Sequence, residues 1–191
     1  TGFKYIRDIR SLDDFNGVWN LRINDFEDEF MISSSQMGPF PEGLQVGLVN
    51  INERKVLLNF LDHKEVILNN KNSVYDLKVI AGDQEYVKSM SQEILSSIPQ
   101  EFSLGQNYPN PFNPITQMEY SLPQSSKVVI SIYNVLGQEI KTLVNKEQDY
   151  GYHSVSWDGT DRLGKSVASG VYFTQMRSDG FSQSKKMLLL K

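Results

Sequence analysis

The segment from residue 106 to residue 116 constrains the fold of this chain more than any other segment. It reads QNYPNPFNPIT, so three prolines alternate with asparagines between aromatic residues. Each proline fixes its own φ and biases the preceding residue towards extended backbone, which disfavours a helix and a central strand. We expect residues 106–116 to form a stiff strap that Tyr108 and Phe112 pin to a neighbouring surface. The asparagine side chains would bond backbone groups that no sheet ladder reaches.

The residues after the strap alternate between apolar and polar with a period of two, which is typical of half-buried strands. A tight hairpin is expected at residues 134–138, with Gly137 in the positive-φ position. In the last strand we expect Leu188 and Leu190 to face the core, and the strand itself to form an exposed edge. The predicted strands are residues 115–120, 128–133, 139–144, 153–157, 171–177 and 183–190.

The first half of the chain also consists of short alternating segments separated by turn residues. About seven strands at this spacing indicate a sandwich. Trp19 lies in one of them, and we interpret it as a core residue rather than a sugar-stacking platform. The predicted strands are residues 3–9, 18–23, 29–33, 44–50, 55–60, 65–68 and 73–80.

Between the halves the apolar period changes to that of a helix. Val87, Met90, Ile94 and Ile98 recur three or four residues apart, which predicts a short amphipathic helix that ends at Pro99. Such a helix could pack against both domains and hold them rigidly, or it could fray and leave them independent. The sequence leaves both arrangements open.

Composition and charge exclude several classes of protein. The chain has no cysteine, which excludes disulfides, thiolate catalysis and the usual zinc sites. Residues 106–191 hold nine Lys/Arg against seven Asp/Glu, or +2, so the net charge of −4 leaves −6 for residues 1–105. Neither half has the clustered basic residues of a nucleic-acid binder. No apolar run is long enough to span a bilayer. The N-terminus lacks the pattern of a signal peptide, so if the protein is secreted, we expect this chain to be a fragment whose export signal lay upstream.

Candidate sites for chemistry are few. Asp158 and Asp161 could supply oxygen ligands to Ca²⁺, but the same residues could instead cap turn amides, and the third carboxylate of an EF-hand loop is absent. The two histidines, His63 and His153, fall in different domains and outside any catalytic motif. We therefore expect no enzyme activity, no cofactor and no structural metal.

Five separated sequence blocks carry a specific resemblance. In order they are QNYPNPFNPIT, MEYSLP, VVISIYNVLGQEIKTLV, GYHSVSWDGTDRLGKSVASGVYF and KKMLLLK. With these blocks, residues 102–191 resemble the C-terminal sorting domain of bacterial proteins exported by the type IX (Por) secretion system. The fold of that domain is similar to the immunoglobulin-like domain of the flagellar hook-capping protein. We therefore predict an all-β chain of two immunoglobulin-like antiparallel sandwiches (residues 1–82 and 102–191) joined by a short helical connector (residues 83–101).

The resemblance implies a non-catalytic C-terminal region of a secreted or cell-surface protein. Its partners would be the outer-membrane secretion machinery, a sortase-like peptidase that transfers the cargo to a surface lipopolysaccharide, and upstream domains of the same polypeptide. The expected sorting residues are Asn107, Tyr108, Pro109, Asn110, Pro111, Phe112, Asn113, Pro114, Lys185, Lys186, Met187, Leu188, Leu189, Leu190 and Lys191.

Two other functions are compatible with the sequence. One is a structural spacer of a larger extracellular protein. The other is a carbohydrate-binding or protein-binding module that uses aromatic residues of the first half, namely Phe15, Trp19, Phe26 and Phe30.

Overall fold

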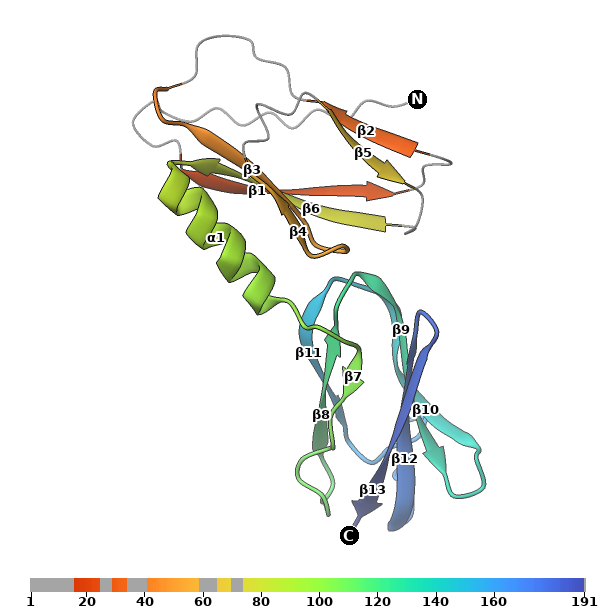
Figure 1. The fold of residues 1–191 in the computed structure, drawn as a ribbon. Coiled ribbons are helices and arrows are strands. Elements are labelled where there is room, and N and C mark those ends of the chain that lie inside the picture. Colours follow the sequence, from red (N-terminus) through yellow and green to blue (C-terminus); the bar gives the residue numbers. More distant parts are fainter. Residues whose placement is uncertain (1–15, 25–28, 34–40, 59–64, 70–73, 191) are drawn as a thin grey trace. The chain divides into compact units, whose positions relative to one another are not determined.

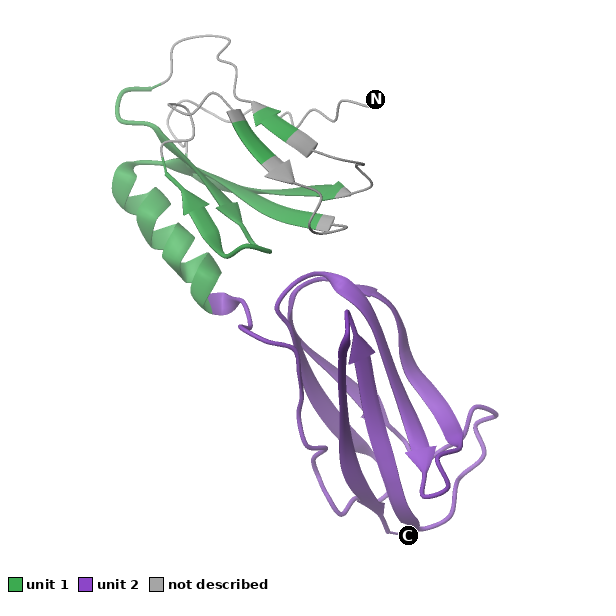
Figure 2. Cartoon of the chain, turned by 45° about the vertical axis from the view of Figure 1, so that its right-hand side comes forward, with its two compact units in different colours: residues 1–96 green, residues 97–191 purple. Residues whose placement is uncertain are grey.

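The chain divides into two compact units, residues 1–96 and residues 97–191 (Figure 2). The structure is a computed structural model that describes residues 16–24, 29–33, 41–58, 65–69 and 74–190. The predicted strand at residues 3–9 lies outside the described residues. The predicted fold class is confirmed, since the described residues form antiparallel sheets with a single helix (Figure 1).

The first unit is built on a four-stranded antiparallel sheet in the order β1-β6-β3-β4. These strands are β1 (Gly17–Asn24), β3 (Gln45–Asn50), β4 (Lys55–Leu57) and β6 (Val74–Gly82). A two-stranded ribbon, β2 (Glu29–Ser33) with β5 (Glu65–Asn69), accompanies the sheet. All six were predicted as strands, and β4 ends earlier than the predicted residue 60 because residue 58 is already a bend.

The core of the first unit lies between the ribbon and the sheet. Ile32 of β2 and Val66 of β5 pack against a cluster of buried residues that includes Leu48 and Leu77 of the sheet. Trp19 packs against the same cluster as a partly buried side chain. The burial of Trp19 supports its interpretation as a core residue.

The helix α1 (Gln84–Ser97) packs on the sheet of the first unit. Asp83 caps its start, because Asp83 Oδ1 accepts a hydrogen bond from the amide of Tyr86 at 2.7 Å. A Cβ atom at Gly47 of β3 would lie 2.8 Å from a methyl group of the buried Val87, so the absence of a side chain there lets the helix approach the sheet. The predicted helix is confirmed, and its role as an interdomain connector stays a prediction.

The second unit is a sandwich of two antiparallel sheets in the orders β10-β9-β12-β13 and β11-β8-β7. Their strands are β7 (Ser103–Leu104), β8 (Thr116–Leu122), β9 (Ser126–Asn134), β10 (Glu139–Gln148), β11 (Gly151–Trp157), β12 (Gly170–Ser178) and β13 (Phe181–Leu189). The predicted turn between β9 and β10 is confirmed, with Gly137 at φ +74°. Strand β10 continues four residues beyond the predicted residue 144.

The core of the second unit is formed by alternate residues of both sheets, as the period of two requires. Met118 and Leu122 of β8 face Ile130 and Ile132 of β9, and all four side chains are fully buried. Trp157, at the end of β11, closes this core and is 1% exposed.

The predicted orientation of the last strand is wrong. In β13 the side chains of Met187 and Leu189 are fully buried, whereas Leu188 is only partly buried and Leu190 is 49% exposed. A shift of one residue moves every side chain of a strand to the opposite face. Three consecutive leucines give no alternation from which that choice can be made.

The orientation of β13 predicts different effects for two truncations of neighbouring leucines. Leu189→Ala should lower the free energy of unfolding by about 2–5 kcal/mol, because it leaves a cavity in the core. Leu190→Ala should change it by no more than about 0.5 kcal/mol, because that side chain is largely in solvent. Urea denaturation of the two variants measures both values. A larger loss in Leu190→Ala than in Leu189→Ala would contradict this orientation.

Candidate functional site

Strand β13 is an edge strand, and its outer edge requires cover. It is the last strand of its sheet and pairs with β12 on one side only. An open edge exposes alternate amide and carbonyl groups to which another chain can add a strand. The segment that runs from residue 102 through the strap lies along this edge.

The first contacts with β13 come from residues just before the strap and from its first residue, Gln106. The ring of Phe102 stacks on Phe181 at the start of β13, with ring centroids 5.7 Å apart. The amide of Leu104 then donates to Gln183 Oε1 at 2.8 Å. Further along, Gln106 Nε2 donates to the carbonyl of Lys186 at 2.8 Å. Residues 102–106 and β13 therefore run in the same direction.

Asn110 of the strap bonds β13 as a backbone peptide would. Its Oδ1 accepts a hydrogen bond from the amide of Leu188 at 2.9 Å. Its Nδ2 donates to the carbonyl of Lys186 at 3.3 Å. A proline follows Asn110, and proline has no N–H to offer to a ladder, so the side-chain amide supplies the donor and the acceptor that the edge needs.

Phe112 completes the attachment of the strap. Its amide donates to the carbonyl of Leu188 at 3.0 Å, and its carbonyl accepts from the amide of Leu190 at 2.9 Å. Its ring is 2% exposed and lies 5.6 Å from the ring of Trp157. The expectation that the last strand forms an exposed edge is therefore wrong for Lys186 to Leu190, because the strap occupies that edge.

The two aromatic residues of the strap have different roles, and only Phe112 is a side-chain anchor. Tyr108 was expected to pin the strap as well, but its side chain is 83% exposed. The backbone of Tyr108 makes the attachment instead, since its N–H and C=O both bond to Gln117 of β8, at 2.8 and 3.0 Å. With both backbone groups paired to the strand, its side chain projects outward.

Asn107 is a buried polar residue of the strap and is 2% exposed. Its Nδ2 donates to the carbonyl of Pro109 at 3.0 Å and to Thr116 Oγ1 at 2.9 Å. Thr116 Oγ1 in turn donates to the same carbonyl at 2.9 Å. The expected role of the asparagines is confirmed for Asn107 and Asn110, because both bond backbone groups outside the sheet ladders.

The turn that follows Trp157 lies directly beneath the strap. Gly159 has φ +69°, and a Cβ atom there would lie 3.3 Å from the carbonyl of Pro114 and 3.5 Å from a methyl group of Leu189. Trp157 Nε1 donates to the carbonyl of Thr160 at 2.9 Å, which fixes the turn. The structure thus brings together residues of the strap, the turn and the last strand that are far apart in the sequence. Lys191 lies outside the described residues.

Tyr172 of β12 extends this aromatic cluster. Its ring packs edge-on against Trp157 with centroids 5.1 Å apart, and its hydroxyl donates to the carbonyl of Ala168 at 2.8 Å. Burial raises the pKa of the Tyr172 hydroxyl, so this group stays protonated at neutral pH.

The geometry of Asp158 and Asp161 supports turn capping. Asp158 Oδ1 accepts hydrogen bonds from the hydroxyl and the amide of Thr160, at 2.6 and 3.1 Å, and lies 3.2 Å from the Lys141 ammonium. Asp161 Oδ1 accepts from the amides of Leu163 and Lys165, both at 2.9 Å. The Lys141 ammonium is therefore the cation beside the Asp158 carboxylate. In the described part of the chain, no group of three or more His, Cys, Asp or Glu could hold a metal ion.

Exposed apolar side chains gather at the end of the sandwich where the strap lies. Strands β8 and β12 begin at this end, and β9, β11 and β13 finish there (Figure 1). Among the described residues of the second unit, Tyr152 is the one large exposed apolar side chain at the opposite end. The side chains at the strap end are Tyr108, Ile115, Val135, Leu136, Leu163 and Leu190.

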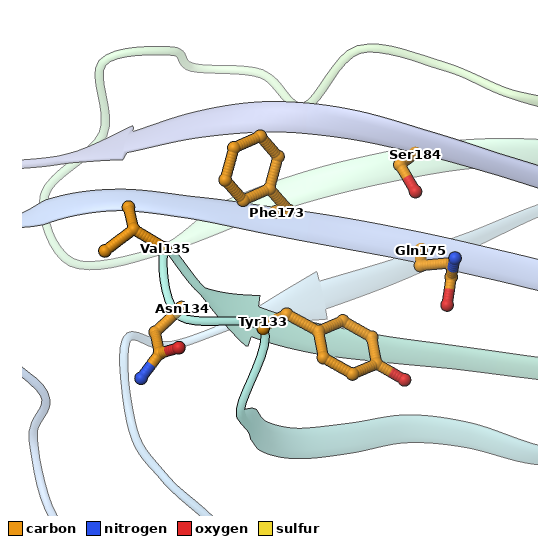
Figure 3. A pocket seen from close by; sticks show the side chains of 7 residues that line it. Tyr133, Asn134, Val135, Phe173, Gln175 and Ser184 are labelled. Carbon is orange, nitrogen blue, oxygen red and sulfur yellow. The ribbon is translucent and has the colours of Figure 1, made fainter.

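A shallow hollow of about 390 Å³ borders this end, on the outer face of the sheet that contains β12 (Figure 3). Sequence reasoning did not find it, because it depends on the cross-strand pairing of Tyr133 in β9 with Phe173 in β12. Its lining residues are Tyr133, Asn134, Val135, Gly137, Phe173, Gln175 and Ser184.

Among the other candidate residues, the structure describes Trp19 and His153, which belong to different units. Phe15, Phe26 and His63 lie outside the described residues, as does the side chain of Phe30, so the structure does not test an aromatic binding face in the first unit. His153 stacks on Tyr120 with ring centroids 5.4 Å apart, and its Nε2 lies 2.7 Å from the carbonyl of Asp149. In the described part of the chain, no helix combines the length and the apolar character needed to cross a membrane.

Comparison with known families gives one match, to the FlgD Ig-like domain, over residues 115–180. The matched range begins at residue 115, at the end of the strap, and ends before β13. No curated protein matches this chain.

The solved structures that are similar to parts of this chain include the following three. FlgD from P. aeruginosa is 27% identical over 39% of this chain and 59% of its own, with a TM-score of 0.31. PorZ from Porphyromonas gingivalis, described as an essential surface component of the type-IX secretion system, is 16% identical over 59% of this chain and 14% of its own, with a TM-score of 0.33. Dimeric latent PorU from the same organism is 13% identical over 92% of this chain and 18% of its own, with a TM-score of 0.40.

The bonds of Asn110 to β13 predict a measurable loss of stability when they are removed. Asn110→Ala should lower the free energy of unfolding by about 1 kcal/mol, because it leaves the amide of Leu188 to solvent and removes one of the two donors to the carbonyl of Lys186. Asn113→Ala is the matched control, and its effect should stay within about 0.5 kcal/mol, since the Asn113 side chain is exposed and makes no hydrogen bond to the described residues. Guanidinium denaturation of both variants makes the comparison, and equal losses would contradict the proposed contact.

The contacts of Asp158 predict a small dependence of stability on pH. The Thr160 hydroxyl, and then the Lys141 ammonium, hold the pKa of the Asp158 carboxyl below its usual range. The stability that Asp158 contributes is therefore present above the pKa of the unfolded chain, about 4, and is lost as the pH falls through the lower folded value. The Asp158 side chain is 54% exposed, so we expect an effect below about 1 kcal/mol.

Urea denaturation at pH 7 and at pH 3 should show this effect as a smaller loss of stability in Asp158→Asn than in the parent protein. An identical loss in both proteins would contradict the role of the charge. Calcium chloride should leave the melting temperature of the parent protein unchanged, because Asp158 and Asp161 already accept hydrogen bonds from amides of the turn.

Proposed function

We propose that the second unit is a C-terminal transport domain, which directs export of a secreted or cell-surface protein through the type IX secretion system and leads to its attachment at the surface. The domain is not an enzyme. Its partners are the outer-membrane secretion machinery, a sortase-like peptidase, and upstream domains of the same polypeptide.

One observation carries this proposal: sequence blocks that resemble sorting-domain motifs meet in one structure. The strap, the turn after Trp157 and the end of β13 touch one another, through the Phe112–Trp157 ring contact and the bonds of Asn110 and Phe112 to β13. The match to the FlgD Ig-like domain over residues 115–180 supports the sandwich fold that brings these blocks together.

The geometry suits a module that is recognised by a receptor while it carries unrelated cargo. A receptor needs a surface that does not change from one passenger to another, and the strap is held to β13 by backbone and side-chain hydrogen bonds. The strap also occupies the edge where strands of other chains could add, which reduces aggregation of the module before export. The exposed side chains at the strap end are then available for recognition.

Deletion of residues 102–191 in the native host tests the proposal. The cargo should remain inside the cell, and cell fractionation with surface labelling measures its distribution. Asn110→Ala should reduce surface display more than the matched variant Asn113→Ala, because only the first disturbs the attachment of the strap. Unchanged surface display after the deletion would contradict the transport function and favour a structural spacer.

A further inference from the structure

We infer that the hollow beside the β9–β10 turn is a docking site for a bulky apolar side chain of a protein partner. The choice of partner rests on the proposed function, since we take the partner to belong to the export machinery. The docking site differs from the contact between the strap and β13, because none of its lining residues belongs to the strap or to the turn after Trp157.

The walls of the hollow are aromatic and aliphatic. Tyr133 and Phe173 are cross-strand partners on β9 and β12, and the β9–β10 turn brings Val135 to the same hollow (Figure 3). Val135 is 66% exposed and its neighbour Leu136 is 77% exposed, although both lie in a turn where polar residues are usual. Apolar side chains that stand in water around a concave surface are typical of an interaction site.

The side-chain amide of Asn134 at the hollow is bonded within the protein, which favours an apolar occupant over a sugar. Asn134 Oδ1 accepts from the amides of Leu136 and Gln138, at 2.9 and 3.0 Å. Asn134 Nδ2 donates to Gln138 Oε1 at 2.8 Å. Carbohydrate recognition needs several convergent donors and acceptors beside the aromatic rings, and the amide of Asn134 is already used to build the turn.

Charges of both signs flank the hollow, and this favours a protein over an anionic membrane. Lys186 of β13 is the cross-strand partner of Phe173, and Glu139 of β10 is the cross-strand partner of Tyr133. Cross-strand partners point to the same face of a sheet, so the hollow lies between an exposed ammonium and an exposed carboxylate. An apolar centre within a polar rim is the usual anatomy of a protein interface. The matching partner presents an apolar side chain between a basic and an acidic residue.

A minimal probe of this chemistry is a capped tripeptide, acetyl-Lys-Phe-Asp-amide, with acetyl-Lys-Ser-Asp-amide as its control. Each is titrated into the full ¹⁵N-labelled chain, and amide chemical shifts are recorded by NMR. The Phe peptide should shift the amides of residues 133–137 and 173–175 with saturable binding, at least roughly tenfold tighter than the Ser peptide, since burial of an aromatic side chain contributes about 1.5–3 kcal/mol. Val135→Asp should abolish these shifts.

Two further titrations separate the competing occupants. Glucose oligosaccharides and vesicles that contain anionic phospholipid should leave the amides of residues 133–137 and 173–175 unchanged. Equal binding of the Phe and Ser peptides would overturn the inference. Saturable shifts at these residues with the oligosaccharide or the vesicles, and none with the Phe peptide, would also overturn it.

A test in the native host distinguishes failure of this inference from failure of the proposed function. Val135→Asp should reduce surface display of the full protein by roughly tenfold or more, as expected for loss of one apolar contact at an interface. Tyr152→Asp is the matched control, because Tyr152 is 75% exposed at the opposite end of the sandwich, and it should display normally. Thermal denaturation should show that both variants fold.

If deletion of residues 102–191 blocks export but Val135→Asp and Tyr152→Asp display equally well, the docking inference is wrong and the transport function stands. If the deletion itself has no effect, the transport function is wrong. Binding of the Phe peptide in solution would then still support an apolar docking site, with a partner outside the export machinery.

Discussion

Burial of the Phe112 ring against Trp157 is the contact on which the rest of the second unit depends. The ring centroids are 5.6 Å apart, and Phe112 is 2% exposed. A buried ring fixes the backbone that carries it, so the amide and carbonyl of Phe112 lie where Leu188 and Leu190 can bond them. Two residues earlier, Asn110 then reaches the amide of Leu188. A single aromatic anchor thus sets the register of the strap along the edge strand.

This arrangement covers the open edge of the sheet at β13 without adding a regular strand. Prolines cannot continue a ladder, because they lack an N–H group. The strap therefore bonds β13 at alternate points, partly through the side chains of Gln106 and Asn110. The edge is protected, and the side chains that remain in water at this end, such as Val135 and Leu136, are held on a rigid sandwich. Recognition would then depend on side chains rather than on strand addition.

Much of this architecture follows from local patterns in the sequence. Alternation locates the strands, and the glycine of the β9–β10 turn takes the positive φ that its position predicts. The sequence does not determine which aromatic residue of the strap is buried, because Tyr108 and Phe112 have similar neighbours and only the tertiary pairing of Tyr108 with Gln117 turns its ring outward. The same holds for Leu188 and Leu189, where a run of leucines conceals which face is inside. The hollow could not be predicted either, since its walls come from three strands and a turn.

Amide hydrogen exchange of β13 tests the central claim most directly. In an open edge strand, the outward amides of Leu188 and Leu190 would face solvent. In this structure they donate to Asn110 Oδ1 and to the carbonyl of Phe112. The account predicts slow exchange at both positions, with protection comparable to that of Met187 and Leu189, whose amides face β12. Exchange of Leu188 and Leu190 at the rate of unprotected amides, while Met187 and Leu189 stay protected, would contradict it.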